Sequence, residues 1–181
     1  MLAAALFSAL AAPRHWPLFK QCDPRWGAHE MGVNGTGERS TICGEGCAMT
    51  SLAMVLNALQ VPYPGAPLLI DPGNFNAWLM ANNGYTCAAG DCNNLVLDAV
   101  ERLTPLVTLF GELPAPPYSD IVRGLKNGTV AYIAHVAAMH HFVLLESPDG
   151  RHNFTVKDPF YNATSYSYDA FSDIIMYTLR G

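Results

Sequence analysis

Cys47 is the residue whose surroundings best predict a nucleophile. It follows Gly44-Glu45-Gly46 and begins an apolar segment with helical periodicity. The side chains at the i, i+3, i+4 and i+7 positions of one face are Leu52, Val55, Leu56 and Leu59. A thiol in the first turn of a helix meets unpaired N–H groups and the positive end of the helix dipole, and both favour the thiolate that attacks carbonyl carbon. The alternative is a structural cysteine, because cysteine is often buried as a small apolar residue.

His141 and Asp158 are the candidates for a base and for the group that orients it. A Pro-Asp-Gly-Arg turn at 148–151 joins the two strand-like runs that hold them. If the numbers of paired residues sum to 299, His141 lies directly opposite Asp158. The carboxylate then accepts a hydrogen bond from the imidazole and fixes its tautomer, as a general base requires. The alternative is a weak, solvated contact on a surface hairpin.

The alternation of apolar and polar side chains along the strand-like run 152–158 predicts that His141 and Asp158 face the core. Phe154 and Val156 share a side with Asp158, while the intervening residues point the other way. His140 faces away from His141, so only one of the two histidines can meet the thiol. The same geometry argues against a shared metal ion, and the chain has no Cys-x-x-Cys motif. We therefore expect neither a metal nor a cofactor.

The composition favours one globular domain that does not bind nucleic acid. The chain has 181 residues, half of them hydrophobic, and a net charge of −5 without a basic stripe. Residues 1–12 resemble a secretory signal peptide and are too short to span a membrane, which leaves 13–181 as the mature domain. The glycosylation sequons begin at Asn34, Asn127, Asn153 and Asn162. We expect a secreted or lumenal glycoprotein of the extracellular or endolysosomal space.

The five cysteines predict two disulfides and one free thiol. In an oxidising compartment an odd number leaves one cysteine over. Cys87 and Cys92 flank a short loop and can close on each other, and Cys22 can then pair with Cys43. Sequence alone allows other pairings, so this scheme depends on the role assigned to Cys47.

The elements that position these residues indicate an α+β fold. Helices are predicted over 47–60, 74–82, 91–102 and 118–126. Strands are predicted over 129–136, 141–147, 152–158 and 173–179. The segment 16–39 and the prolines at 114, 116 and 117 are expected to be irregular. Helices first and strands later favour an antiparallel C-terminal sheet packed on the first helix.

Several short blocks in a shared order resemble the C39-like cysteine peptidases, a branch of the papain-like fold. The resemblance covers about residues 19–160 and is carried by the segments 19–27, 41–56, 76–85, 141–143 and 156–159. It implies that Cys47 attacks the scissile carbonyl, that His141 transfers the proton and that Asp158 orients the imidazole. It also implies that Gln21 donates a hydrogen bond to the oxyanion. Gln21 is otherwise an ordinary loop side chain.

Together these features predict a secreted cysteine peptidase that hydrolyses peptide bonds in a peptide or protein substrate through an acyl-enzyme. The same triad also serves amidases and acyltransferases. The alternative from a different class is a non-catalytic binding module of the same fold.

Overall fold

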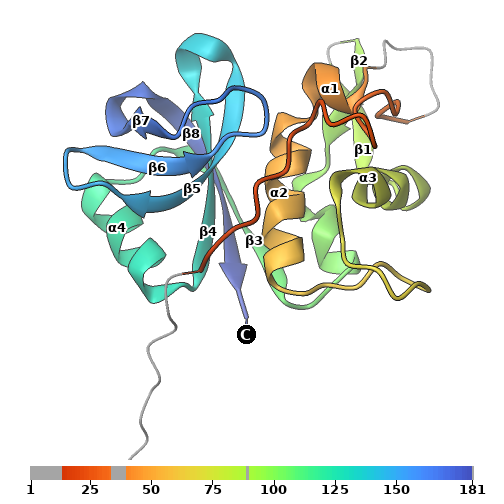
Figure 1. Ribbon diagram of the computed structural model, residues 1–181, viewed down its shortest axis with the longest axis horizontal. Coiled ribbons are helices and arrows are strands. Elements are labelled where there is room, and N and C mark those ends of the chain that lie inside the picture. The colour runs from red at the N-terminus through yellow and green to blue at the C-terminus, as the bar shows by residue number, and fades with distance from the viewer. Residues whose placement is uncertain (1–13, 34–39, 89, 181) are drawn as a thin grey trace, which may run out of the picture.

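The computed structural model describes residues 14–33, 40–88 and 90–180 and shows an α+β fold (Figure 1). The N-terminal half contains α1 (Ile42–Glu45), α2 (Cys47–Ala58), α3 (Pro72–Ala81), the hairpin of β1 (Tyr85–Ala88) and β2 (Asp91–Leu95), and the 3₁₀ helix η1 (Leu97–Arg102). The rest contains β3 (Val107–Pro114), α4 (Tyr118–Asn127), β4 (Val130–Val136), η2 (Ala137–Met139), β5 (His141–Pro148), β6 (Asn153–Lys157), β7 (Ser165–Ser167), η3 (Tyr168–Ala170) and β8 (Phe171–Leu179).

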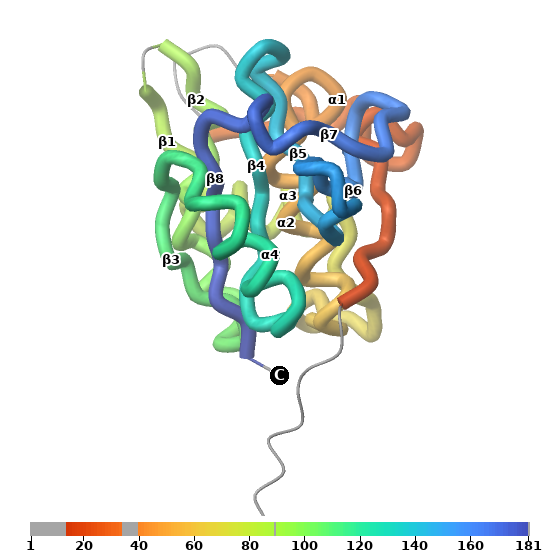
Figure 2. The backbone as a smooth tube through the Cα atoms, turned by 90° about the vertical axis from the view of Figure 1, so that its left-hand side faces the viewer, coloured from red at the N-terminus to blue at the C-terminus, as the bar shows by residue number. Residues whose placement is uncertain are grey.

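The C-terminal strands form an antiparallel six-stranded sheet with helices on both faces. The strand order is β3-β8-β4-β5-β6-β7. One face packs against α2, and the opposite face is covered by α4, which lies in front of the sheet in Figure 2. The apolar residues accordingly form two clusters, one on each side of the sheet. The predicted packing of the Cys47 helix on an antiparallel sheet is therefore confirmed.

Helix α2 starts at Cys47 because of a tight junction with α1. Thr41 caps α1 by accepting a hydrogen bond from the N–H of Gly44, and Gly46 separates the two helices. A Cβ atom on Gly46 would lie 2.4 Å from the carbonyl oxygen of Ile42, so this junction requires glycine. The helix then buries every residue from Met49 to Leu56, and this burial holds its first residue in place.

The other helix predictions divide into two outcomes. The helices over 74–82 and 118–126 are confirmed as α3 and α4, and α4 ends at Gly128, whose φ is 62°. The helix predicted over 91–102 is wrong, because β2 pairs there with β1 and only η1 follows. The disulfide from Cys87 to Cys92 closes this hairpin. The periodicity of a short, mainly apolar run such as Leu95–Val100 is not enough to distinguish a helix from a strand.

The strand predictions are confirmed in position, but the register predicted for the hairpin is wrong. Leu145 pairs with Val156, and Ser147 pairs with Thr155 across a bulge, so the paired numbers sum to 301 and 302 instead of 299. The turn is wider than predicted because Gly150 and His152 both adopt left-handed backbone angles. On the side of the bulge away from the turn, the observed register differs from the predicted register by two residues. Because side chains alternate with a period of two, every side chain there stays on its predicted face of the sheet.

Strands β1, β3 and β7 were not expected from the sequence. Strand β3 runs to Pro114, which was predicted to be loop, and it lies at the sheet edge beside β8. A proline is tolerated there because an edge strand leaves one row of N–H groups unpaired.

The predicted disulfides are present, and the structure bears in part on localisation. Cys22 is bonded to Cys43, Cys87 is bonded to Cys92, and Cys47 is free. Two disulfides fit an oxidising, extracellular or lumenal compartment. Within the described ranges, no helix combines the length and the apolar character needed to cross a bilayer. The signal peptide proposed for 1–12 and the sequon at Asn34 lie outside the described residues.

Candidate active site

Cys47 lies at the N-terminus of α2 and lines a cleft of about 840 Å³. The cleft lies between the helical half and one end of the sheet, and His141 and Gln21 also line it. Cys47 is partly exposed, so a ligand in the cleft can reach its sulfur. The first turn of a helix also presents N–H groups without intrahelical partners, which can bind an anion formed beside the sulfur.

His141 is held between Asp158 and Cys47. Its Nε2 lies 2.8 Å from Oδ1 of Asp158, and the exposed fractions of the two residues are 5% and 1%. Because Nε2 is bonded to the carboxylate, Nδ1 is the nitrogen left to interact with the Cys47 thiol, which contributes to the pKa of His141. The structure thus brings together the sulfur, imidazole and carboxylate that the sequence predicted, although His141 and Asp158 are diagonal and not directly opposed.

The surroundings of His141 favour its charged form. Burial lowers its pKa, but the hydrogen bonds to Asp158 and Cys47 and the charges of these groups outweigh burial and raise the pKa to about 9. Burial alone would raise the pKa of Asp158, yet hydrogen bonds from His141, the Phe160 N–H and Tyr166 lower it. The pair is therefore an imidazolium and a carboxylate at neutral pH.

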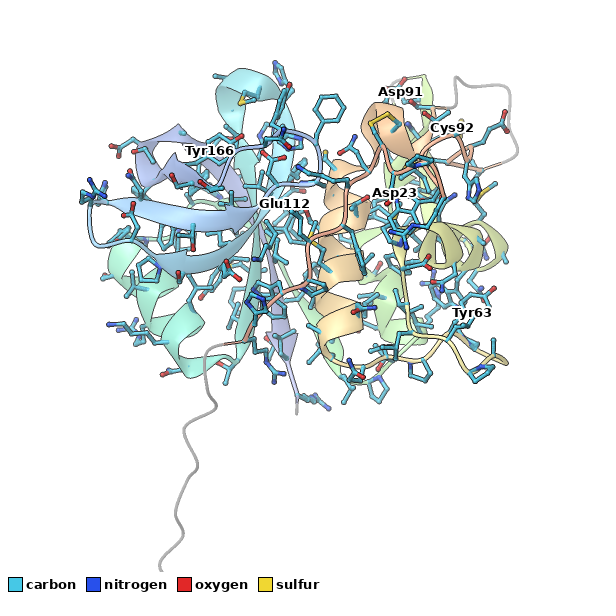
Figure 3. All side chains as sticks on the ribbon, in the orientation of Figure 1. Asp23, Tyr63, Asp91, Cys92, Glu112 and Tyr166 are labelled. Carbon is cyan, nitrogen blue, oxygen red and sulfur yellow. A yellow bond between two sulfur atoms is a disulfide. The ribbon has the colours of Figure 1, made fainter. Side chains whose placement is uncertain are left out.

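Asp158 follows the last residue of β6, and a tight set of donors fixes its carboxylate. Oδ1 accepts hydrogen bonds of 2.8 Å from the N–H groups of Phe160 and Tyr161, in addition to the bond with His141. Oδ2 accepts a 2.8 Å bond from the hydroxyl of Tyr166 in β7 (Figure 3). The sequence analysis missed Tyr166, because a three-residue strand carries no periodic pattern that could have placed it.

Two aromatic rings cover the exposed side of His141. The ring centroid of Tyr161 lies 5.3 Å from that of the imidazole, nearly perpendicular to it, and that of Phe160 lies 6.3 Å away. Both aromatic residues are more than two-fifths exposed and line the cleft. They shield the bond between His141 and Asp158 from water, which strengthens it.

Gln21 reaches the cleft because its loop folds back onto α1. The N–H of Gln21 donates to the carbonyl of Pro159 and its Nε2 donates to the carbonyl of Cys43, both at 2.8 Å. The disulfide between Cys22 and Cys43 fastens the same loop to α1. The side chain is only 2% exposed, and one hydrogen of Nε2 remains for another acceptor. The long sequence separation from Cys47 thus does not keep Gln21 from the cleft.

No family model matches the chain, and no curated protein or solved structure matches it significantly. Among the described residues, His, Cys, Asp and Glu side chains form no group of three or more that could hold a metal ion.

We predict that the imidazole of His141 titrates with a pKa of about 9, well above its ordinary value of 6.5. Replacing Asp158 by asparagine or Cys47 by alanine should lower that pKa, because each partner raises it. Two-dimensional NMR of histidine side chains measures this, with the His141→Asn variant assigning the signal. A His141 signal that titrates near 6.5 in the unmodified protein would contradict the hydrogen-bonded arrangement.

Proposed function

We propose that the chain is a thiol hydrolase that cleaves peptide bonds through an acyl-enzyme, a cysteine peptidase of the C39-like, papain-like kind. The observation that carries this proposal is that the free thiol of Cys47 acts on His141 and raises its pKa, while His141 is hydrogen-bonded in turn to the buried Asp158. A structural cysteine needs no such partners. The partly exposed position of the thiol in a cleft adds to the support.

In the proposed reaction, Nδ1 of the protonated His141 holds the proton of Cys47, and the Cys47 thiolate attacks the scissile carbonyl carbon. The oxyanion accepts hydrogen bonds from the N–H of Cys47 and from the remaining hydrogen of Gln21 Nε2. A donor of this kind is worth about 2.7–4 kcal/mol in other enzymes. The carbon–nitrogen bond then breaks as His141 returns the proton to the leaving amine. Water, deprotonated by His141, finally hydrolyses the thioester and frees Cys47.

The protein environment also supports a proposed location and substrate class. The two disulfides and the exposed sequon residues Asn127 and Asn162 support a secreted or lumenal protein, extracellular or endolysosomal. An open cleft that is lined by the proposed nucleophile suits a peptide chain that enters from solvent. The same triad could also hydrolyse other amides or transfer the acyl group to an amine.

The test is digestion of a peptide library by the disulfide-intact protein, with products identified by mass spectrometry. We expect cleavage at defined bonds and its complete loss in Cys47→Ala, with an unchanged circular dichroism spectrum. Products joined to an added amine would identify acyl transfer instead of hydrolysis. No difference between the protein and Cys47→Ala would leave a binding module as the better interpretation.

A further inference from the structure

The cleft around Cys47 is acidic at one end. Three carboxylates from different elements line the cleft, namely Glu45 of α1, Asp91 of β2 and Glu112 of β3. Asp91 and Glu112 are labelled in Figure 3. Asn93 donates a hydrogen bond to Glu45, which ties α1 to β2. Among the described residues that line the cleft, none is a lysine or an arginine. A bound chain therefore meets uncompensated negative charge at this end.

Glu112 faces the same side of the sheet as the nucleophile. It pairs with Ile175 in β8, which belongs to the core under α2 and also lines the cleft. Directly paired residues of antiparallel strands point to the same face, so Glu112 points toward the cleft. Strands β8 and β4 separate β3 from the strand that begins with His141. Glu112 and the aromatic rings of Phe160 and Tyr161 therefore lie at opposite ends of the cleft.

The proposed chemistry fixes the direction of a substrate in this cleft. His141 must protonate the leaving nitrogen, so residues after the scissile bond lie over His141 and the aromatic end. Residues before the scissile bond belong to the acyl group and extend from Cys47 the other way, toward the carboxylates. We propose, as a deepening of the peptidase function on which it rests, that the cleft selects substrates with lysine or arginine on the N-terminal side of the scissile bond.

The same negative charge acts on a buried tyrosine of the core beside this end. The pKa of the Tyr177 phenol is raised first by burial and then by the charges of Glu112, Asp98 and Glu101. These carboxylates thus extend the negative potential around η1 and β3.

The test compares fluorogenic peptides that differ only by arginine or its neutral isostere citrulline, placed in turn at the three positions before the scissile bond. At the best position we expect kcat/KM to favour arginine by about 10-fold or more at low ionic strength, and the ratio to fall as salt is added. Glu112→Gln and Asp91→Asn should each reduce the ratio by about 3-fold or more and leave hydrolysis of the citrulline peptide unchanged. The control is Asp169→Asn, because the Asp169 side chain is 77% exposed and outside the cleft, and it should not change the ratio.

The outcomes separate this inference from the function on which it depends. Equal hydrolysis of the arginine and citrulline peptides, both lost in Cys47→Ala, would overturn the preference for basic residues and leave the peptidase standing. A preference that survives both carboxylate variants would overturn the assignment to Glu112 and Asp91. Absence of Cys47-dependent hydrolysis of any peptide would overturn the peptidase function and the selectivity together.

Discussion

His141→Asn should slow peptide hydrolysis by about 10³-fold or more and strongly slow alkylation of Cys47 by iodoacetamide at pH 7. In the proposed reaction the charged imidazole stabilises the Cys47 thiolate and protonates the leaving amine, and the neutral imidazole then deprotonates water, so its loss affects every step. Asparagine fits beside Asp158 and can donate a hydrogen bond to it, which keeps the fold intact. The measurements are kcat/KM on a peptide identified in the library digest and the alkylation rate by intact-mass spectrometry.

The neighbouring histidine provides the matched control. His140 is exposed and has a left-handed φ of 46°, a conformation that asparagine also tolerates. His140→Asn should keep both rates within about threefold of the unmodified protein. If His141→Asn also keeps the alkylation rate while the protein is folded, Cys47 does not depend on this imidazole, and the proposed triad is wrong.

The sequence contains enough information to predict helix α2, which begins at Cys47. Leu52, Val55 and Leu56 mark one helical face, and Gly46 marks the junction before Cys47. The odd number of cysteines similarly predicts a single free thiol once the role of Cys47 is assigned. These are local patterns or simple counts, and neither depends on how distant segments pack.

The pairing of His141 with Asp158 was predicted for a reason that is only partly correct. The predicted register fails because the turn is wide and a bulge lies between Leu145 and Ser147. Because side chains alternate with a period of two, a shift of two residues leaves both groups on one face of the sheet. The face was therefore predictable from alternation, whereas the register depends on turn geometry that no residue pattern revealed.

The residues that the sequence analysis missed depend on tertiary packing. Tyr166 reaches Asp158 only because the short strand β7 pairs with β6. Glu112 enters the cleft because β3 joins the sheet edge beside β8, and β3 was not predicted at all. The hairpin of β1 and β2, which brings Asp91 to the cleft, replaces a predicted helix. The candidate catalytic residues were thus identifiable from local sequence, while their supporting and charged neighbours come from long-range strand pairing.

The sign of the pH dependence of stability follows from the two shifted pKa values. His141 has a folded-state pKa of about 9 against an ordinary 6.5, so its contribution is complete below pH 6.5 and is lost as the pH rises through 9. Asp158 has a lowered pKa, so its contribution is present above its ordinary value of 3.8 and is lost as the pH falls through the folded-state value. The pair therefore stabilises the fold most at pH values where Asp158 is ionised and His141 is still protonated.

Asp158→Ala should lower the free energy of unfolding by about 3–5 kcal/mol at pH 7, because it removes a buried carboxylate and leaves its partners without an acceptor. Those partners are the His141 imidazole, the N–H groups of Phe160 and Tyr161 and the Tyr166 hydroxyl. Asp158→Asn keeps an acceptor oxygen and the volume, so it should cost about 1–2 kcal/mol.

Urea unfolding with the disulfides intact measures these losses, and Asp169→Ala at an exposed site is the control, expected to change stability by less than about 0.5 kcal/mol. The cost of Asp158→Ala should also shrink as the pH is raised above 9, because a neutral His141 interacts less strongly with the carboxylate. A loss for Asp158→Ala as small as the control's would mean that this carboxylate does not hold the site together. Without such an anchor the imidazole would not be fixed behind the thiol, and the catalytic assignment of Asp158 would fail with it.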